Sequence, residues 1–479
     1  MSDSRPPGVT GSDASLHEVG TTEREPVDRS VWVALALGAG AMTVASFYVT
    51  ATNLAFPEIE VTFASTSRAT LSWAISGYSI GLAAFLLVGG RLADRYGRKR
   101  LFLGGCAMLA VTSVLTAAAP TATTFIIGRF LQSVGAAFAI PSSLAMALPL
   151  FPTSRRGEAV AMWSMAGSVG AATGPSLSAL VISMSWRGVY LLGVPVLVAI
   201  IVLAPGRLTE SSDGGTGSRL DWFGGAAGTL GVGGIVFAVT QSRAWGWSNP
   251  WVVSTLLGAV VLLPLFVLRS LHHSDPLLDV RVFRTRTVWS ANLTNLFLSM
   301  AGNSIWLVWP LFLGGIWGWS PLRIGLAITP GPVNAGIFAV VAGRLLSKVG
   351  PRRLVSIGCL FPVAALVFFY LVPGEEPNYW TGFLPGVLLF STGFGLTFSP
   401  LNAAALEDVP EAKFGQVNAA FNTLRNVAGA FGAAAVIALL GSRATSDLAA
   451  FDRTYAFLAL CTVLAALTVL TTYPKHGRS

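Results

Sequence analysis

Long apolar segments follow one another along almost the whole chain, and they limit its possible folds more than any other feature. After residue 30, runs of mostly apolar residues alternate with short stretches of glycine, proline and charged residues. A helix needs about 20 apolar residues to cross a lipid bilayer, so each run predicts one transmembrane helix. We expect fourteen spans, at 31–55, 71–90, 101–118, 124–146, 159–182, 188–204, 222–241, 251–270, 288–316, 323–343, 354–373, 380–404, 415–440 and 454–473. The predicted fold class is therefore an all-α polytopic membrane protein.

The composition excludes other classes of protein. Of the 479 residues, 53% are hydrophobic and 11% are charged, whereas about 25% charged residues are usual in soluble domains, so a soluble enzyme is excluded. No lysine precedes Ser or Thr as a phosphate-binding loop requires, and no histidine lies in a span. The three cysteines lie in apolar runs without metal or disulfide spacing and are predicted to be packing residues. We expect no enzymatic activity, no nucleotide, no cofactor and no metal.

The distribution of positive charge predicts how the chain lies in the membrane. Lys and Arg concentrate in the short cytoplasmic loops of membrane proteins. Of the 31 basic residues, 23 lie in the two tails and the even-numbered loops, six lie in odd-numbered loops and two lie inside spans. Both termini are therefore predicted to be cytoplasmic. Charge that is distributed by topology, rather than gathered on one domain, also argues against a nucleic-acid partner.

The N-terminal segment and the choice of basic residue predict the location of the protein. Residues 1–30 are polar and lack the apolar region of a cleavable signal peptide, so a disordered cytoplasmic tail is expected there. Arginine supplies 27 of the 31 basic residues, which is typical of a GC-rich bacterial genome. We therefore expect a multi-pass protein of a bacterial cytoplasmic (plasma) membrane.

A repeated motif predicts how the spans are grouped. Gly90-Arg-Leu-Ala-Asp-Arg-Tyr-Gly-Arg-Lys-Arg100 follows the second span, and Gly343-Arg-Leu-Leu-Ser-Lys-Val-Gly-Pro-Arg-Arg353 follows the tenth. If the two copies mark equivalent positions in two six-helix units, the seventh and eighth spans are an insertion. The predicted architecture is 6 + 2 + 6. Its parts are a tail at 1–30, a six-helix bundle at 31–204, a linker with two inserted helices at 205–287, a second six-helix bundle at 288–473 and a cytoplasmic tail at 474–479.

With this motif and this grouping of spans, the chain resembles a fourteen-helix member of the major facilitator superfamily. The segment 90–100 is similar to the best-known signature of that superfamily, and the resemblance covers nearly everything after residue 30. Within the superfamily, the chain looks most like the drug:proton antiporter (multidrug exporter) branch. The resemblance implies two six-helix bundles around a central site that opens alternately to each side of the membrane.

The first copy of the motif is the candidate gate. It places one carboxylate, Asp94, among five cations between two helix ends. Charge-assisted hydrogen bonds among these groups can lock one state of the transporter and release it in another. The alternative is a positive-inside anchor with an incidental acid. The second copy has Ser347 in place of the acid, so we expect an asymmetric gate. The predicted gating residues are Gly90, Arg91, Asp94, Arg95, Gly97 and Arg98.

A polar stripe in the fourth span is a candidate for substrate binding or coupling. Arg129 lies about six residues into this span, where a cation costs about 2.5–3.5 kcal/mol unless it faces protein or water. Gln132 and Ser133 share its face, and the stripe resembles the fourth-helix motif of the family. We expect this face to lie inside the bundle, and the alternative is that Arg129 reaches the membrane surface by snorkelling.

The glycine pattern of the fifth span favours export. Gly167, Gly170 and Gly174 share one helix face and permit close helix packing, and Pro175 is expected to bend the helix. This pattern resembles the motif associated with exporters of the family. Any tightly packed glycine-rich helix is the alternative interpretation.

Two later spans each carry a polar face. Asparagine in a membrane helix needs a hydrogen-bonding partner. The stripe of the ninth span either joins two helices or lines a substrate cavity, and the stripe of the thirteenth is interpreted as cavity lining. The members are Asn292, Asn295, Asn303 and Trp306 on the ninth span, and Asn418, Asn422 and Arg425 on the thirteenth.

The first span leaves the coupling ion open. It ends with Tyr48 and Asn53 among its polar residues, and proton-coupled members of the resembled branch carry Asp where Tyr48 stands. None of the 22 acidic residues lies well inside a span, so a proton carrier would have to be Glu58, Asp94 or the Arg129 region acting through substrate or water. The two cations inside spans favour neutral or anionic substrates, since a charge about 4 Å away interacts by about 4 kcal/mol at an effective dielectric near 20.

The predicted function is secondary active export of small amphipathic molecules, such as drugs, antibiotics or secondary metabolites, coupled to protons. The expected partners are the small-molecule substrate, protons and the lipid bilayer. A metabolite importer or facilitator without proton coupling is the alternative. A non-transporting membrane sensor is a more remote one, because a sensor would not need polar stripes on several helices.

Overall fold

The computed structural model of the protein describes residues 27–182, 184–211, 221–273, 276, 278–440 and 447–474. Within these ranges every regular element is a helix, so the predicted all-α class is confirmed. Most of the two expected tails lies outside the described residues. The first helix begins at Arg29, two residues earlier than the expected boundary.

The helices before residue 205 correspond to the first six expected spans. The sixth span is divided into two helices, because Pro195 at the start of the second one has no N–H to continue the first. Two short 3₁₀ turns precede the fifth span. The bounds are α1 (Arg29–Thr62), α2 (Arg68–Leu71), α3 (Trp73–Tyr96), α4 (Arg98–Ala117), α5 (Ala122–Ala147), η1 (Leu148–Leu150), η2 (Thr153–Arg155), α6 (Arg156–Ile182), α7 (Trp186–Leu191) and α8 (Val194–Leu203).

The remaining helices correspond to the expected spans from the seventh to the fourteenth. The tenth span is divided in the same way as the sixth, with Pro330 at the start of its second helix. The bounds are α9 (Trp222–Trp245), α10 (Pro250–His272), η3 (Val280–Arg284), α11 (Arg286–Gly315), α12 (Pro321–Ile328), α13 (Pro330–Val349), α14 (Pro351–Leu371), α15 (Tyr379–Gly382), α16 (Leu384–Leu406), η4 (Glu411–Lys413), α17 (Phe414–Leu440) and α18 (Leu448–Thr472).

The number of spans agrees approximately with the fourteen expected. Thirteen helical segments of the described chain are long and apolar enough to cross a membrane. The remaining expected span, 159–182, falls within α6, a single helix of 27 residues that packs against α1 and α13. The chain is therefore a multi-pass membrane protein. All three cysteines are buried with free thiols, as expected of packing residues.

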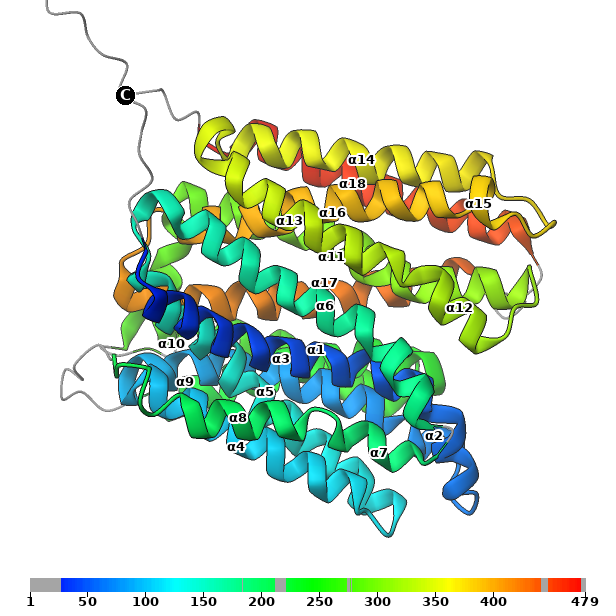
Figure 1. The fold of residues 1–479 in the computed structure, drawn as a ribbon, viewed down its shortest axis with the longest axis horizontal. Coiled ribbons are helices and arrows are strands. Elements are labelled where there is room, and N and C mark those ends of the chain that lie inside the picture. The colour runs from blue at the N-terminus through cyan, green and yellow to red at the C-terminus, as the bar shows by residue number, and fades with distance from the viewer. Residues whose placement is uncertain are drawn as a thin grey trace, which may run out of the picture.

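Two groups of helices face each other along the molecule (Figure 1). The first group, α1 to α8, meets the second group, α11 to α18, mainly where α6 packs on α13 and α3 packs on α17. Both ends of the described chain lie at the same end of the molecule, which we call the terminal end. The contact of α3 with α17 is called the seam.

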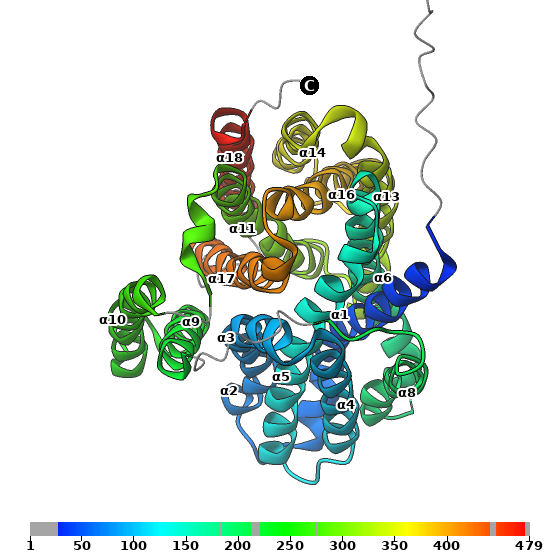
Figure 2. The same cartoon turned by 90° about the vertical axis from the view of Figure 1, so that its left-hand side faces the viewer.

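The two inserted helices stand to one side of both groups (Figure 2). The inner helix, α9, packs against α3 and against α17, and the outer helix, α10, packs on α9. Ala83 of α3, Val236 of α9 and Ala420 of α17 belong to one hydrophobic cluster. The insertion therefore covers one side of the seam. α10 exposes Leu257 and Val260, as expected of a helix that faces lipid.

Candidate functional site

The seam is closed at the terminal end by a close approach of two backbones. A Cβ added to Gly90 on α3 would lie 2.7 Å from the Cβ of Ala419 and 2.7 Å from the carbonyl oxygen of Gly415, both on α17. Any side chain at residue 90 would therefore push α17 away. Gly90 allows the two groups of helices to meet here.

Asp94 and Arg98 form a buried ion pair next to this contact. The Asp94 side chain is fully buried, and Nε of Arg98 donates to its Oδ1 at 3.0 Å. The same guanidinium donates to the carbonyl oxygen of Ala145 on α5 at 3.1 Å and to that of Glu411, just before α17, at 2.8 Å. Arg98 therefore connects Asp94 to both groups of helices.

The Asp94 carboxylate also lies against the first turn of α17. A Cβ added to Gly415 would be 2.6 Å from Oδ1 of Asp94. The start of a helix carries a partial positive charge, which stabilises a nearby carboxylate. Two further predicted gating residues belong to the same stretch of α3: Arg91 is buried, and the guanidinium carbon of Arg95 lies 5.7 Å from the ring centroid of Tyr96.

The end of the motif binds the segment that follows α8. Gly97 ends α3 with a φ of 113°, a conformation that favours glycine. The N–H groups of Lys99 and Arg100, in the first turn of α4, donate to the Glu210 carboxylate at 3.0 and 3.1 Å. Lys99 and Arg100 therefore serve a contact within the first group of helices, whereas Arg98 donates a hydrogen bond to the second group.

The second copy of the motif is built differently, in keeping with the expected asymmetry. A Cβ added to Gly343 on α13 would lie 2.5 Å from the Cβ of Ala161 on α6, so this copy also sits at a close helix contact. Ser347 is exposed at the position where the first copy has its buried acid. An ion pair between Arg156 of α6 and Glu411 joins the two groups of helices nearby.

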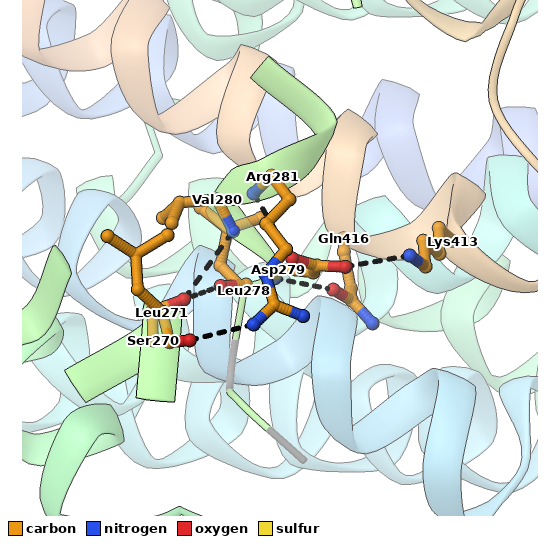
Figure 3. A network of polar contacts seen from close by, with 8 residues as sticks. All are labelled: Ser270, Leu271, Leu278, Asp279, Val280, Arg281, Lys413 and Gln416. Carbon is orange, nitrogen blue, oxygen red and sulfur yellow. Dashed lines mark hydrogen bonds and ion pairs between the residues drawn. The ribbon is translucent and has the colours of Figure 1, made fainter. Parts of the chain in front are cut away.

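The segment 278–284 between α10 and α11, here called the strap, is fixed to the start of α17 (Figure 3). Oδ2 of Asp279 accepts from Nζ of Lys413 at 2.8 Å, and the Asp279 N–H donates to Oε1 of Gln416 at 3.2 Å. The hydroxyl of Ser270 on α10 donates to a carbonyl group of the strap. The strap thus links the inserted helices to the turn of α17 that contacts Asp94.

The Asp279 carboxyl is held in its charged form. Burial raises its pKa, but the hydrogen bond and charge of Lys413 and the N–H of Arg281 outweigh burial, and the pKa is lowered overall. A lowered pKa contributes stability that is fully present above the ordinary value and is lost as the pH falls through the lowered one. The ion pair is therefore intact at neutral pH and weakens only in acid.

Removing the charge of Asp279 is expected to have a small effect. Asp279→Asn should lower the transport rate no more than about fivefold, because a partly exposed ion pair contributes only about 0.2–1 kcal/mol. Asp279→Lys should cost more, since it places two cations side by side, and the exchange Asp279→Lys with Lys413→Asp should recover most of the loss. Initial rates in membrane vesicles at matched protein levels test this. An exchange variant no better than Asp279→Lys would contradict a role for this pair.

Arg129 is enclosed within the first group of helices. It is 1% exposed, and its Nε donates to the carbonyl oxygen of Ala74 at 3.2 Å. Its guanidinium carbon lies 4.4 Å from the ring centroid of Tyr78 and 5.7 Å from that of Tyr190. Among the described residues no carboxylate contacts it. The side chain does not snorkel, and its donors are used inside the bundle.

Tyr48 belongs to the same enclosed cluster. Its hydroxyl donates to the carbonyl oxygen of Tyr190 at 2.8 Å, and the Tyr190 hydroxyl donates to Thr52 at 3.2 Å. Gln132 accepts a hydrogen bond from the Arg129 guanidinium. Asn53, by contrast, is exposed on α1. Tyr48 stands where members of the resembled branch carry an acid, and here its hydroxyl makes a hydrogen bond within the first group of helices.

The glycines of α6 are contact points with α1. A Cβ added to Gly170 would lie 2.1 Å from the carbonyl oxygen of Thr43, and one added to Gly174 would lie 1.9 Å from Oγ1 of Thr50. A Cβ added to Gly167 would meet the end of a methionine side chain at 2.9 Å. The predicted close packing of this face is therefore present. The side chain of Pro175 lies outside the described set.

The polar stripe of α11 joins this helix to α17 along part of its length. Nδ2 of Asn295 donates to the carbonyl oxygen of Phe421 at 2.9 Å, and Nδ2 of Asn303 donates to that of Arg425 at 3.1 Å. Asn292 bonds to a carbonyl group of its own helix. For Asn295 and Asn303 the arrangement favours a role in joining helices. Trp306 remains 38% exposed.

The asparagines of α17 also bond locally. Nδ2 of Asn422 donates to the backbone carbonyl oxygen of Asn418 at 2.8 Å and to its Oδ1 at 3.0 Å, and both side chains are buried. Arg425 differs, because its side chain is half-buried and lies beside the ring of Phe398. Of the three predicted cavity-lining residues of this helix, Arg425 is the one whose side chain is not buried.

Several site residues were not predicted from the sequence. The tyrosines around Arg129, the Glu411 contacts and the strap all involve residues far apart in the chain, such as Arg156 and Glu411, which are 255 positions apart. The one available signal was the cation itself, since an arginine inside a span must have partners.

The fold and the closed seam define a membrane carrier built from two groups of helices. A family model described as Major Facilitator Superfamily matches residues 37–433. The chain therefore belongs to the major facilitator superfamily, as the motif at 90–100 indicated, and it is a transporter rather than an enzyme.

The chain is similar in sequence to drug and antibiotic exporters. The chain is 30% identical to the drug efflux pump JefA of Mycobacterium tuberculosis, over 80% of this chain and 75% of JefA. It is 29% identical to the cephamycin export protein CmcT of Amycolatopsis lactamdurans, over 97% of both chains. The fold is similar to that of the proton:xylose symporter XylE, with a TM-score of 0.67, 15% identity and coverage of 93% of this chain and 96% of that one.

Proposed function

We propose that the protein is a secondary active transporter that exports small amphipathic molecules across the cytoplasmic membrane by alternating access. The observation that carries this proposal is the buried Asp94–Arg98 pair, which binds the first group of helices to the start of α17 at one end of the molecule. A closure made of a few polar contacts between two groups of helices can break and re-form during a transport cycle. Its exporter relatives support the direction.

The terminal end is proposed to be cytoplasmic. Basic residues dominate the loops at this end, and such loops lie on the cytoplasmic side of membrane proteins. In this orientation the structure is closed toward the cytoplasm. We propose that residues 31–204 and 288–473 act as the two moving bundles, and that α3 separates from α17, and α6 from α13, when the cytoplasmic side opens to admit substrate.

Protons are the proposed coupling ion, and Asp94 is the proposed carrier. Asp94 is fully buried at a contact that must open in each cycle, whereas Glu58 is exposed. Protonation would remove the charge that Arg98 binds, so it would weaken the closure on the cytoplasmic side. Tyr48 is not a candidate, because a phenol with an ordinary pKa near 10 keeps its proton at neutral pH.

A pH gradient is expected to drive transport in proteoliposomes of inside-out orientation. With an acidic lumen, amphipathic test compounds should accumulate above their equilibrium distribution, and a protonophore should abolish the accumulation. A cephamycin belongs in the panel, because the relative CmcT is named for its export. Empty liposomes are the control for passive partition. Equilibration at the same rate with and without the gradient would contradict coupling and favour a facilitator.

A further inference from the structure

Arg425 is a cation deep in a span whose charge is not neutralised by any acid of the described chain. It is the twelfth residue of α17, and its side chain is half-buried. Within the described ranges its guanidinium makes no ion pair or hydrogen bond, and its recorded contact is the ring of Phe398, whose centroid lies 5.8 Å away. Because lipid does not tolerate such a charge, Arg425 must face the interior of the protein.

Comparison with Arg129 shows that a structural role does not explain Arg425. Both arginines lie inside spans. Arg129 is fully buried, donates to a carbonyl group and to Gln132, and has tyrosine rings on its faces. Within the part of the chain that the structure describes, donors of Arg425 have no partner, and its side chain keeps an accessible surface. A guanidinium with unused donors is suited to bind a group that enters from outside the bundle.

An aromatic ring of α16 lies beside Arg425, and α16 and α11 carry further aromatic side chains. The Phe398 and Phe394 rings of α16 lie 4.4 Å apart, and the Phe394 ring rests on Gly302 of α11, where a Cβ would be 1.8 Å from it. On α11, Asn303 donates to the Arg425 carbonyl oxygen and so fixes the backbone that carries the guanidinium. Trp306, about one turn further along α11, is 38% exposed.

The charge of this region has a single sign. The acidic residues described in the second group of helices lie in loops or near helix ends: Glu375 and Glu376 lie between α14 and α15, Glu407 and Asp408 follow α16, Glu411 precedes α17, and Asp447 and Asp452 stand at the start of α18. Arg425 lies in the middle of its helix, away from these ends. A permanent cation would therefore be repelled here, and an anion would be attracted.

We propose that Arg425, with Phe398 and Trp306 as apolar walls and Asn303 as a positioning residue, forms a subsite for amphipathic monoanions. The ligand class is a carboxylate, or an equivalent single negative charge, attached to an aromatic or other apolar body. The planar guanidinium matches a carboxylate through two parallel hydrogen bonds, and the aromatic side chains cover the apolar part. This inference rests on the proposed export function and names its substrate class.

Binding to the purified full-length protein in lipid nanodiscs tests the subsite. The probes are 1-naphthaleneacetate, its neutral amide 1-naphthaleneacetamide, and the (1-naphthylmethyl)trimethylammonium cation, which share one ring system and differ in charge. We expect the anion to bind more tightly than the cation. Arg425→Gln should weaken binding of the anion about tenfold or more and leave the amide within about twofold, because a charge-assisted bond is lost and the walls remain.

Two further variants complete the test. Arg425→Lys should retain part of the preference for the anion, because lysine keeps the positive charge but cannot form the two parallel hydrogen bonds of a guanidinium. Arg323→Gln removes an exposed arginine at residue 323 that stacks on Trp319, and it should leave all three affinities unchanged. Thermal melting confirms that each variant is folded.

The subsite would be overturned if the cation bound best, or if Arg425→Gln weakened binding of the anion and the amide equally. Binding does not depend on the direction of transport. Charge-selective binding without export would therefore overturn the proposed function alone, and export with no effect of Arg425→Gln on charge preference would overturn the subsite alone.

Discussion

Asp94→Asn is expected to reduce transport to near background while the protein remains folded in the membrane. Among the described residues the buried Arg98 guanidinium has one carboxylate partner, Asp94, and it also donates to carbonyl groups of both groups of helices. Asparagine keeps the shape but removes the charge. Leaving one member of a buried pair without its partner costs about 3–5 kcal/mol. A penalty of that size would reduce the population of the cytoplasm-closed state more than about a hundredfold.

Glu158→Gln is the matched control for this substitution. Glu158 pairs with Arg155 at 3.0 Å near the same end of the molecule, but the two residues belong to one stretch of chain and do not cross the seam. We expect this variant to keep more than about half of the wild-type rate, since a pair three residues apart at the start of a helix contributes only about 0.2–0.5 kcal/mol. Size-exclusion profiles and melting curves establish that both variants are folded.

Downhill flux without a pH gradient separates the two roles proposed for Asp94. A residue that only carried protons would leave downhill flux of substrate intact when it is changed to Asn. A residue that also closes the gate would lose downhill flux as well, and that is the expected result. Wild-type rates in both assays would show that the Asp94–Arg98 pair is an anchor without a gating role.

The sequence was sufficient to predict the arrangement of spans because a bilayer demands long apolar helices. The boundaries differ where local chemistry intervenes: Pro195 and Pro330 divide two spans, and α1 extends to Thr62, beyond the expected end at residue 55. The close packing of Gly170 and Gly174 also followed from the sequence, because small residues on one helix face permit a close approach.

The partners of the site residues could not be predicted in the same way. Nothing in the motif at 90–100 indicates that Arg98 reaches Glu411 or that Asp94 meets Gly415, since these contacts join segments more than 300 residues apart. The sequence showed that Arg129 and Arg425 lie inside spans, but it did not show how their environments differ. The contacts distinguish them: Arg129 has partners within its bundle, whereas donors of Arg425 have no partner among the described residues.

The inserted helices are the part of the fold on which the sequence was least informative. Their apolar runs predicted two spans but gave no position for them. In the structure α9 lies along the seam, and the strap after α10 binds Lys413 and Gln416 at the start of α17. A segment attached to both sides of a moving contact is placed to influence it, and the small effect expected for Asp279→Asn reflects the exposure of its ion pair.

A reversible cross-link between α6 and α13 is expected to stop transport completely. A Cβ added to Gly157 on α6 would lie 3.6 Å from the Cβ of Leu346 on α13, within the range of about 3.5–4.5 Å found in disulfides. Both residues lie at the end proposed to be cytoplasmic. Cysteines at these two positions should therefore form a disulfide that holds the two bundles together on that side. The native thiols are buried and can be retained.

Transport by the double variant Gly157→Cys with Leu346→Cys, before and after oxidation, tests alternating access most directly. We expect oxidation to reduce flux to background and a reductant to restore it to within about twofold, because the bundles must separate at this contact in every cycle. Each single-cysteine variant should be indifferent to both reagents. Undiminished flux through protein shown to be fully cross-linked would contradict transport by opening of this contact.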